Sequence, residues 1–399
     1  MSALPLVRLR ELMLDVQTWN PLRSDEDDEF DYIDLSAVSQ ELKAISDARK
    51  LRCAEAPSRA RQLVKANDVL VSTVRPNLNG VALVTNEFDG ATASTGFCVA
   101  RPNPERLNAN YLFHWVKSDA FIKSMVMQAN GASYPAVSDK IVLESVIPLP
   151  DISEQRRIAA ILDKADALRA KRREALTQLD RLAQSIFVEM FGDPIENPKG
   201  WASDLTLGDV ADIVSGVTKG RNLTGKTTRE VPYLAVSNVQ DMRLSLDAVK
   251  VIEATEAEIV RYSLRNGDLL LTEGGDPDKL GRGTLWRSQL PECIHQNHVF
   301  RVRLKSNRLT PHYLNWLIGS QRGKQYFLKS AKQTTGIASI NMTQLRGFPL
   351  LIPPLERQQK FDALLNAIAN WKKSLEKSMQ ALDEMFSSVQ SCGFKGELE

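Results

Sequence analysis

The octapeptide GRNLTGKT at residues 220–227 has the spacing of a phosphate-binding loop, with Gly220, Gly225, Lys226 and Thr227 at its four defining positions. In such a loop the glycines let backbone N–H groups surround a phosphate, and the Lys and Thr begin a helix. The residues that follow here, TREVPYL, contain a proline and favour a strand. The segment is therefore interpreted as a solvated loop or a basic loop that touches DNA phosphates, and a nucleotide site is the alternative.

A second pattern, C-x-H-x-x-H, is formed by Cys293, His295 and His298, whose side chains are of the types that bind zinc. A fourth ligand at useful spacing is missing, and HQNHVF reads as the start of a strand. The E-x-K triplet at Glu41–Lys43 lacks the acidic partner of a nuclease site, and four histidines offer no Ser/His/Asp or Cys/His arrangement. The sequence therefore predicts neither a catalytic residue nor a metal site.

Two long helices are predicted where apolar residues recur at alternating steps of three and four. The first seam contains Ile158, Ile161, Ala165, Leu168, Arg172, Ala175, Leu179, Leu182 and Ile186. The same positions 203 residues later give Phe361, Leu364, Ile368, Trp371, Leu375, Ser378, Leu382, Met385 and Val389. This heptad spacing predicts helices of roughly 35–38 residues, each about 55 Å long, whose narrow apolar stripes need a partner.

The two seams are the obvious partners for one another. Each predicted helix follows a similar globular segment, so we expect an antiparallel coiled coil with pseudo-twofold symmetry. The alternatives are that each helix packs on its own domain, or that the helices pair between two chains.

The globular segments before the helices also repeat, although more faintly. Three pairs of segments resemble one another: NDVLVSTVRP (67–76) and GDLLLTEGGDP (267–277), FDYIDLSAV (30–38) and VPYLAVSNV (231–239), and STGFCVARP (94–102) and QNHVFRVRL (296–304). Short strands cluster without regular intervening helices, which predicts α+β domains and not a doubly wound sheet. The predicted organisation is a domain at 1–150, a helix at 151–192, a second domain at 193–353 and a helix at 354–399.

Composition sets wider limits. A chain of 399 residues with 43% hydrophobic residues is long enough for two or three globular domains. The net charge of +2 means that any nucleic-acid surface must be local. The four cysteines are scattered singly, no apolar run reaches the ~18 residues of a membrane span, and no signal-peptide core is evident. We therefore expect a cytoplasmic protein with no membrane partner.

The segment IPLPDISEQRRIAAILDKADALRAKRREALTQLDRLAQSIFVEMFGDP closely resembles the central conserved helix of type I restriction–modification specificity subunits. The segments GDLLLTEGGDPDKLGRGTLW and CIHQNHVFRVRL resemble the second target-recognition domain of that family. The likeness covers essentially the whole chain and is strongest over 147–194 and 266–354.

The resemblance implies a DNA-reading subunit without catalysis of its own. Each domain would read one half of a bipartite site in double-stranded DNA, and the helices would set the spacer. The helices would also dock two modification subunits, which methylate adenine with S-adenosylmethionine, and restriction subunits that use ATP and Mg²⁺. This chain itself would hold no cofactor. A structural coiled-coil adaptor without a DNA role is the further alternative.

In such a DNA-reading subunit, loop side chains that can form paired hydrogen bonds are the expected base contacts, because Arg suits guanine and Asn or Gln suits adenine. The first-domain candidates are Ser72, Arg75, Asn77, Asn79, Ser133 and Tyr134. The second-domain candidates are Lys279, Arg282, Gln296, Asn297, Thr334, Thr335 and Ser339, with Lys219, Arg221 and Lys226 as phosphate contacts. Any one of them also suits an ordinary turn.

Overall fold

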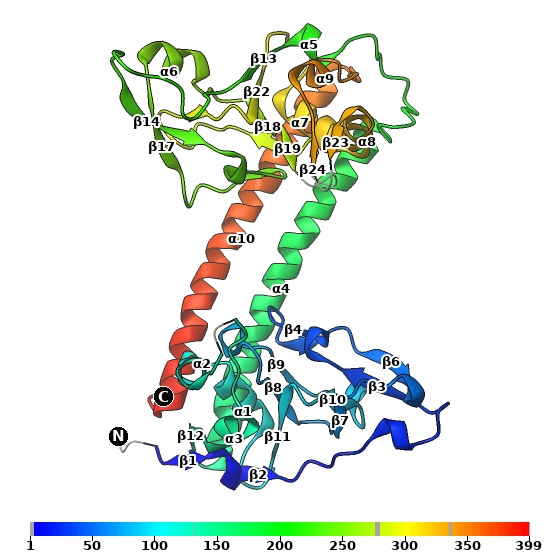
Figure 1. Cartoon of the computed structure of the whole chain (residues 1–399), viewed down its shortest axis with the longest axis vertical. Coiled ribbons are helices and arrows are strands. Elements are labelled where there is room, and N and C mark those ends of the chain that lie inside the picture. The colour runs from blue at the N-terminus through cyan, green and yellow to red at the C-terminus, as the bar shows by residue number, and fades with distance from the viewer. Residues whose placement is uncertain (1–3, 132, 276–279, 335–336, 399) are drawn as a thin grey trace. The chain divides into compact units, whose positions relative to one another are not determined.

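The chain folds into two compact units in a computed structural model that describes residues 4–131, 133–275, 280–334 and 337–398, without the side chains of 332–334 and 337. Unit 1 comprises Met1–Ala175 and Leu375–Glu399, and unit 2 comprises Leu176–Ser374. The long helices α4 (Ile152–Phe191) and α10 (Leu355–Lys395) each contribute residues to both units (Figure 1).

The strands of unit 1 form two four-stranded sheets and two strand pairs beside short helices. They are β1 (Leu6–Arg8), β2 (Met13–Leu14), β3 (Glu29–Ile33), β4 (Val38–Ser39), β5 (Ala44–Ile45), β6 (Arg49–Arg52), β7 (Ala60–Leu63), β8 (Val69–Ser72), β9 (Val81–Leu83), β10 (Thr92–Ser94), β11 (Phe97–Pro102) and β12 (Val146–Pro148). The short helices are α1 (Ala109–Val116), α2 (Asp119–Gln128) and α3 (Asp139–Glu144). The sheet orders are β6-β3-β10-β7 and β2-β11-β8-β9, while β1 pairs with β12 and β4 with β5.

Unit 2 has the same plan. Its strands are β13 (Ala211–Ser215), β14 (Arg229–Leu234), β15 (Val239–Gln240), β16 (Arg243–Leu244), β17 (Lys250–Ala254), β18 (Leu269–Thr272), β19 (Gly274–Gly275), β20 (Gly283–Leu285), β21 (Ile294–His295), β22 (Val299–Leu304), β23 (Lys332–Thr334) and β24 (Ile337–Ser339). Its short helices are α5 (Leu207–Val210), α6 (Glu256–Tyr262), α7 (Pro311–Gly319), α8 (Gln321–Ser330) and α9 (Met342–Arg346). The sheet orders are β13-β22-β18-β20, β17-β14-β21 and β19-β24-β23, and β15 pairs with β16.

The predicted repeat of the two domains is confirmed strand by strand. The antiparallel set β11-β8-β9 of unit 1 corresponds to β22-β18-β20 of unit 2. In each unit one strand also has a parallel neighbour: β3 pairs with β10, and β14 pairs with β21. Strands of both directions with helices grouped after them make an α+β fold, as the sequence predicted.

A buried glutamine holds the start of each long helix against its own domain in the same way. The Gln155 side-chain oxygen accepts the Asn108 N–H at 2.9 Å, and its amide donates to the carbonyls of Arg106 and Pro150. In unit 2, the Gln358 oxygen accepts the Thr310 N–H at 2.8 Å, and its amide donates to the carbonyls of Arg308 and Pro353. Both glutamines are almost fully buried, so each satisfies backbone groups that water does not reach.

The long helices run antiparallel to one another within each unit. In unit 1, Arg169 Nε donates to Asp383 Oδ1 at 2.6 Å, and Arg157 donates to the Leu398 carbonyl near the end of the chain. In unit 2, Lys372 forms an ion pair with Asp180. Rising numbers on one helix meet falling numbers on the other, which confirms the predicted antiparallel pairing. Among the described residues, no helix has an apolar stretch long enough to cross a membrane.

The predicted seam is only half right. Its positions Leu168, Leu182, Leu364, Trp371 and Met385 are 47%, 41%, 37%, 59% and 45% exposed. The inward stripe keeps Ile158, Ala165, Phe361 and Ile368, but at the positions between them it uses the next residue along, namely Leu162, Arg169, Leu365 and Lys372. These positions again alternate steps of four and three, so the spacing of the seam is as predicted, but the inward face of each helix lies toward the next residue.

The alternative that each helix packs on its own domain is also observed, because one stripe serves both purposes. In unit 1, Ile158 and Leu162 share a core with Tyr111 of α1 and with Phe394 of α10. α1 lies against the first turns of α4, where His114 Nε2 lies 2.7 Å from Asp163 Oδ1 (Figure 1). A helix that must contact both a domain and a second helix needs a wider apolar face than a coiled-coil seam provides.

Candidate nucleic-acid interface

Two loops of unit 1 that are distant in sequence lie side by side. One follows β8 at residues 73–80, and the other joins α2 to α3 at residues 129–137. An antiparallel bridge links Val74 of the first loop to Ala136 of the second. The structure therefore brings together the two groups of candidates that the sequence placed in separate loops of the first domain.

Arg75 contacts the second loop through both its backbone and its side chain. The Arg75 N–H donates to the Pro135 carbonyl at 2.7 Å, and the guanidinium carbon lies 4.7 Å from the centre of the Tyr134 ring. Arg75 is exposed, and Tyr134 is 67% exposed. An arginine stacked on an aromatic ring at the surface can still use its in-plane N–H donors for a ligand.

The other first-domain candidates divide by exposure. Asn77 and Ser133 are exposed, whereas the half-buried Ser72 hydroxyl donates to the Val74 carbonyl at 2.9 Å. Asn79 differs from the other candidates, because its side chain is 7% exposed and donates to the Val116 carbonyl at 2.8 Å. Asn79 instead fixes the end of the loop.

Lys43 supports the same loop from another segment. Its amine donates to the Asn79 carbonyl at 2.5 Å, and burial, with a smaller effect of the neighbouring Lys117 charge, lowers the pKa of Lys43 to about 8. The residue stands in the E-x-K triplet that the sequence offered as a weak nuclease signal. Its described contact is structural.

The corresponding loops of unit 2 form the small sheet β19-β24-β23. Gly274 pairs with Ser339, and a Cβ atom at Gly274 would lie 2.9 Å from the Ala338 carbonyl oxygen, so the two backbones approach only because residue 274 is glycine. Ser339 is half-buried in this sheet. Lys279 and Thr335 lie outside the described residues, as does the side chain of Thr334.

Arg282 extends this surface of unit 2 through a contact that the sequence did not indicate. Its Nη1 donates to the Gln240 side-chain oxygen at 3.2 Å. Gln240 lies in the hairpin β15-β16, which has no marked loop motif. A glutamine amide suits contact with adenine. Only the fold brings Gln240 and Arg282 together.

The loop at 220–227 does not have the geometry of a phosphate-binding loop. After Thr227 the chain enters β14, so no helix begins at the Lys-Thr pair. Arg221 is instead bound to the Glu258 carboxylate at 2.6 and 3.0 Å, and chiefly this bond lowers the pKa of Glu258 to about 2.

The remaining basic candidates of this segment differ in their surroundings. Lys219 Nζ lies 5.2 Å from the centre of the Tyr233 ring, and Lys226 is exposed. Lys226 is therefore the more available phosphate contact, while Arg221 is already occupied by a carboxylate.

The C-x-H-x-x-H residues do not converge. His295 is fully buried with Nδ1 2.7 Å from the Val299 carbonyl oxygen, and burial lowers its pKa to about 4. His298 lies at the surface beside the Glu273 carboxylate. No group of three or more metal-binding side chains was found within the part of the chain that the structure describes.

Gln296 and Asn297 lie between these two histidines. Their backbone N–H groups donate to the carbonyls of Leu234 and Val217, each at 2.9 Å, and their side chains are half-buried. The Asn297 amide nitrogen lies 3.2 Å from His298 Nε2. The structure thus places them on one short loop after β21.

Sequence reasoning missed apolar residues beside the loops of unit 1. Leu78 is 38% and Met127 is 81% exposed, and α2 packs against the turn that contains Leu78. The sequence signal for Met127 was the helical periodicity of α2. Phe121 and Met125 face inward, so Met127, two residues further on, faces outward. Exposed apolar side chains in this turn and on the helix packed against it suit contact with a base edge or methyl group.

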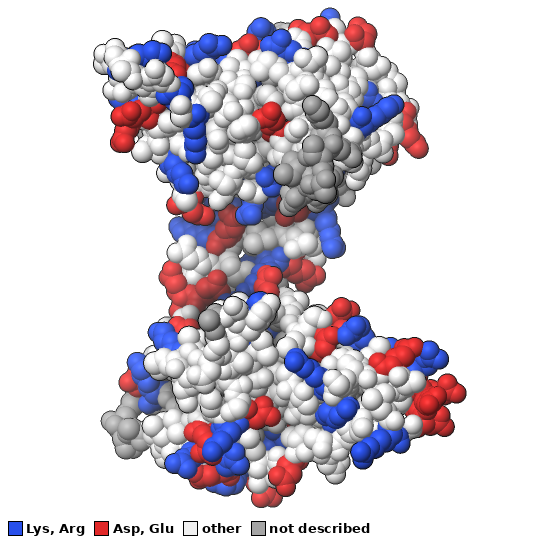
Figure 2. All heavy atoms as spheres, in the orientation of Figure 1, with Lys and Arg blue, Asp and Glu red and all other residues white. Residues whose placement is uncertain are grey.

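Lys and Arg side chains are interspersed with Asp and Glu on the face of the molecule in Figure 2. This mixture agrees with the small net charge of +2. Any contact with phosphates on that face must come from single side chains and not from a broad basic field.

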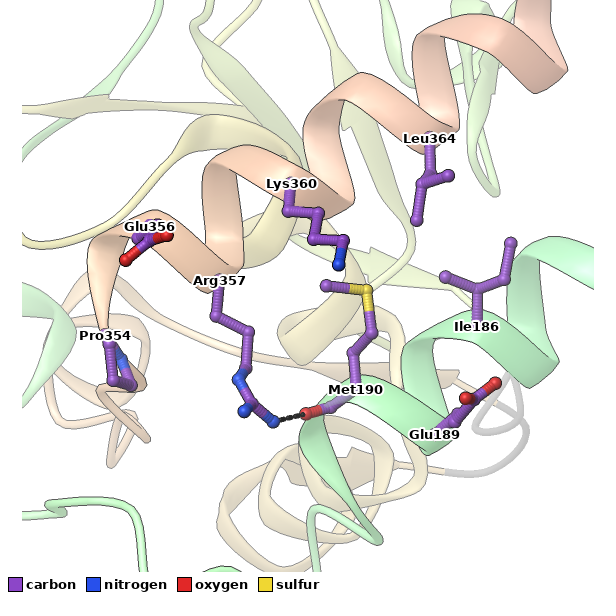
Figure 3. Close-up of a pocket in the computed structure, with 8 residues that line it drawn as sticks. All are labelled: Ile186, Glu189, Met190, Pro354, Glu356, Arg357, Lys360 and Leu364. Carbon is purple, nitrogen blue, oxygen red and sulfur yellow. Dashed lines mark hydrogen bonds between the residues drawn. The ribbon is translucent and has the colours of Figure 1, made fainter.

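A groove of about 600 Å³ lies in unit 2 between the end of α4 and the start of α10 (Figure 3). Its lining consists of Ile186, Glu189, Met190, Pro354, Glu356, Arg357, Lys360 and Leu364. Lys360 and Met190 point toward one another across it, and Arg357 Nη1 donates to the Met190 carbonyl at 3.0 Å. The lining combines the apolar side chains of Ile186, Met190 and Leu364 with the charged side chains of Glu189, Arg357 and Lys360.

These features define a class of protein: a duplicated recognition protein that uses one α+β scaffold twice with different surface loops. A family model described as the type I restriction modification DNA specificity domain matches residues 59–178 and 198–382, which is more than half of the chain. The chain belongs to this family of type I restriction–modification specificity subunits, whose function is DNA sequence recognition.

Relatives and solved structures agree with this assignment. The StySPI specificity subunit of Salmonella potsdam is 24% identical over 76% of this chain and 68% of its own length. The EcoKI specificity subunit of Escherichia coli K12 is 24% identical over 84% of this chain and 76% of its own length. A chain from a structural study of complex assembly in the type I R-M system matches with a TM-score of 0.64 and 25% identity, covering 100% of this chain and 99% of that one.

Proposed function

We propose that each unit reads one half of an asymmetric, two-part site in double-stranded DNA. The observation that supports this most directly is that equivalent strands of the two units carry unlike loops: Arg75 and Tyr134 in unit 1, and the β19-β24-β23 sheet with Arg282 in unit 2. Two unlike readers require two unlike half-sites, whereas a homodimer of one reader would require a palindrome.

Methylome sequencing tests this proposal. Cells that carry the chain with its modification subunits are expected to show adenine methylation at a split, non-palindromic site. A continuous or palindromic site would contradict it. Duplex DNA binding that weakens with salt, measured with the modification subunits present, would argue against the structural-adaptor alternative.

In this proposal the chemistry belongs to other subunits. Two modification subunits would bind S-adenosylmethionine and methylate adenine, and restriction subunits would use ATP and Mg²⁺. The described surface of this chain offers arginine, amide and aromatic side chains that suit base recognition. We place the assembled complex in the cytoplasm, where its DNA target lies.

The nucleotide-binding alternative has a direct test. Titration of the purified chain with ATP and Mg²⁺ is expected to give no heat of binding, because no helix follows Lys226 to complete a phosphate site. Saturable binding that is lost in Lys226→Ala would revive the alternative.

The exposed apolar residues of the long helices are proposed to dock the modification subunits. Leu364 and Trp371 of α10 present apolar surface, and Leu364 also lines the groove in Figure 3. Exposed apolar surface of this kind marks interaction sites, and tryptophan is the residue type most enriched at their energetic centres.

Replacing Trp371 by Ala is expected to weaken binding of a modification subunit by about 30-fold, because truncating a central interface tryptophan typically costs at least ~2 kcal/mol. The fold should be unaffected, since the side chain is 59% exposed. Titration calorimetry or sedimentation measures the affinity. Lys373→Ala, two residues along on an exposed position, is the matched control. Equal affinity for Trp371→Ala and wild type would remove this residue from the docking surface.

A further inference from the structure

Arg75 is held more firmly than an exposed arginine on a loop needs to be. Its backbone has φ +50°, in the left-handed region that residues other than glycine rarely adopt. The Arg75 N–H is fixed by the Pro135 carbonyl at 2.7 Å, and its own carbonyl accepts the Leu78 N–H at 2.9 Å. The loop therefore presents this one side chain from a defined backbone position.

The loop is also fixed at both ends. Thr73 donates through its hydroxyl to the Gly96 carbonyl at 2.9 Å, and Asn79 anchors the other end by its bond to the Val116 carbonyl. Strain at Arg75 persists only because these surrounding contacts fix the conformation. Such strain is typical of positions where a side chain must be presented in one orientation.

Tyr134 fixes the guanidinium itself. The guanidinium carbon lies 4.7 Å from the ring centre, and within the described part of the chain no hydrogen bond occupies its N–H fork. Stacking lowers the conformational entropy that a flexible arginine would lose on binding. An arginine that only neutralised a phosphate would gain little from this arrangement, because phosphate attraction tolerates many orientations.

The other candidate arginines differ in this respect. The guanidinium of Arg221 donates to both oxygens of the Glu258 carboxylate, and Arg282 donates to Gln240. The guanidinium of Arg75 lies over the Tyr134 ring, Leu78 of the same turn is exposed, and so is Met127 of α2, the helix that packs against this turn. This combination of an open fork and apolar neighbours suits the edge of a base pair.

We propose that Arg75 reads a guanine in the half-site of unit 1 by paired hydrogen bonds to O6 and N7 in the major groove, and that Tyr134 positions it. Guanine O6 and N7 are the acceptors that match the arginine fork. The inference rests on the proposed function of unit 1 as a reader of one half-site, and it adds which base one residue recognises.

The test is methylome sequencing of cells that carry the modification subunits with wild-type or variant chains. Wild type is expected to require guanine at one position of the half-site read by unit 1. In Arg75→Ala, the preference for guanine at that single position should fall by roughly 5- to 150-fold, the range for one paired contact, while every other position is unchanged. Arg75→Lys should lose the same preference, because it keeps the charge but not the fork.

Tyr134 variants separate positioning from direct reading. Tyr134→Phe keeps the ring and should retain the guanine preference, whereas Tyr134→Ala should reduce it at the same position and no other. Arg23→Ala removes an exposed arginine of unit 1 outside both loops and should leave the whole site unchanged. Circular dichroism melting of each purified chain verifies that the variants fold.

Two results would overturn the inference. Uniformly lower methylation of all sites in Arg75→Ala would make the residue a phosphate contact, and an unchanged site would remove it from recognition. Failure of the proposed function would look different, because wild type itself would then show no split site.

Discussion

Deleting seven residues from each long helix is expected to shorten the unread spacer of the DNA site by about 3 base pairs, while both half-sites keep their sequences. The deletions are Ala170–Leu176 in α4 and Glu376–Leu382 in α10. Seven helical residues span roughly 10 Å at 1.5 Å per residue, and base pairs are stacked about 3.4 Å apart. Methylome sequencing of the double-deletion strain gives the new spacer directly.

The choice of segments follows from the observed contacts. Both deletions leave the Arg169–Asp383 and Lys372–Asp180 ion pairs in place. Each deletion also keeps the apolar stripe of its helix continuous, because residues seven apart lie on nearly the same side of a helix. The remaining apolar positions should therefore still meet across the pair.

Deleting Ala170–Leu176 alone is the control for this experiment. It shifts α4 by two turns against α10, so one of the two ion pairs must break, and methylation should be lost. An unchanged spacer in the double deletion would refute the expectation from the sequence that the helices set the spacer. Altered half-sites would show that the helices affect reading itself.

The repeat was predictable because it rests on features that are local in sequence. Prolines before each helix, apolar residues at helical spacing and glycine-marked turns can each be recognised in a short stretch of sequence, without knowing what that stretch packs against. The exact stripe was less predictable, because in adjacent apolar pairs such as Ile161–Leu162 and Leu364–Leu365 either member fits the alternation of three- and four-residue steps. Packing against α1 and α7 selects the second member of each pair.

The site shows the same division. The sequence indicated two candidate loops in the first domain, but their contact through Arg75 and Tyr134 is visible only in the fold. The burial of Asn79 did not follow, because an asparagine in a turn has the same sequence signature whether its amide meets a base or the Val116 carbonyl. Likewise, Glu258 lies 37 residues after Arg221, and only the fold makes it a partner.

Replacing Asp268 by Ala is expected to lower the free energy of unfolding of unit 2 by about 3–5 kcal/mol, the cost of leaving one member of a buried ion pair alone. The Asp268 carboxylate is 1% exposed and accepts two bonds from Arg303, both at 2.7 Å. It also accepts the Arg265 N–H at 2.7 Å. Hydrogen exchange of β18 and β22 in urea reports the unfolding of this unit.

Unit 2 contains a matched control with the same geometry at the surface. Arg229 makes two bonds to Glu292 at 2.6 and 2.7 Å, but both side chains are more than 40% exposed. Water solvates whichever charge is left, so Glu292→Ala should cost a small fraction of the Asp268→Ala loss. Similar losses for the two variants would show that burial does not decide the strength of the pair.

The repeat supplies an independent measurement of the same quantity. In unit 1, Asp68 is also 1% exposed, accepts two bonds from Arg101 at 2.9 and 2.7 Å, and accepts the Lys65 N–H at 2.8 Å. Asp68→Ala should therefore destabilise unit 1 by a similar amount.

In unit 2, the double variant Asp268→Leu with Arg303→Met should recover much of the free energy of unfolding that Asp268→Ala loses, because it leaves no buried charge unpaired. If it were as unstable as Asp268→Ala, the Arg265 N–H and not the stranded arginine would account for the loss.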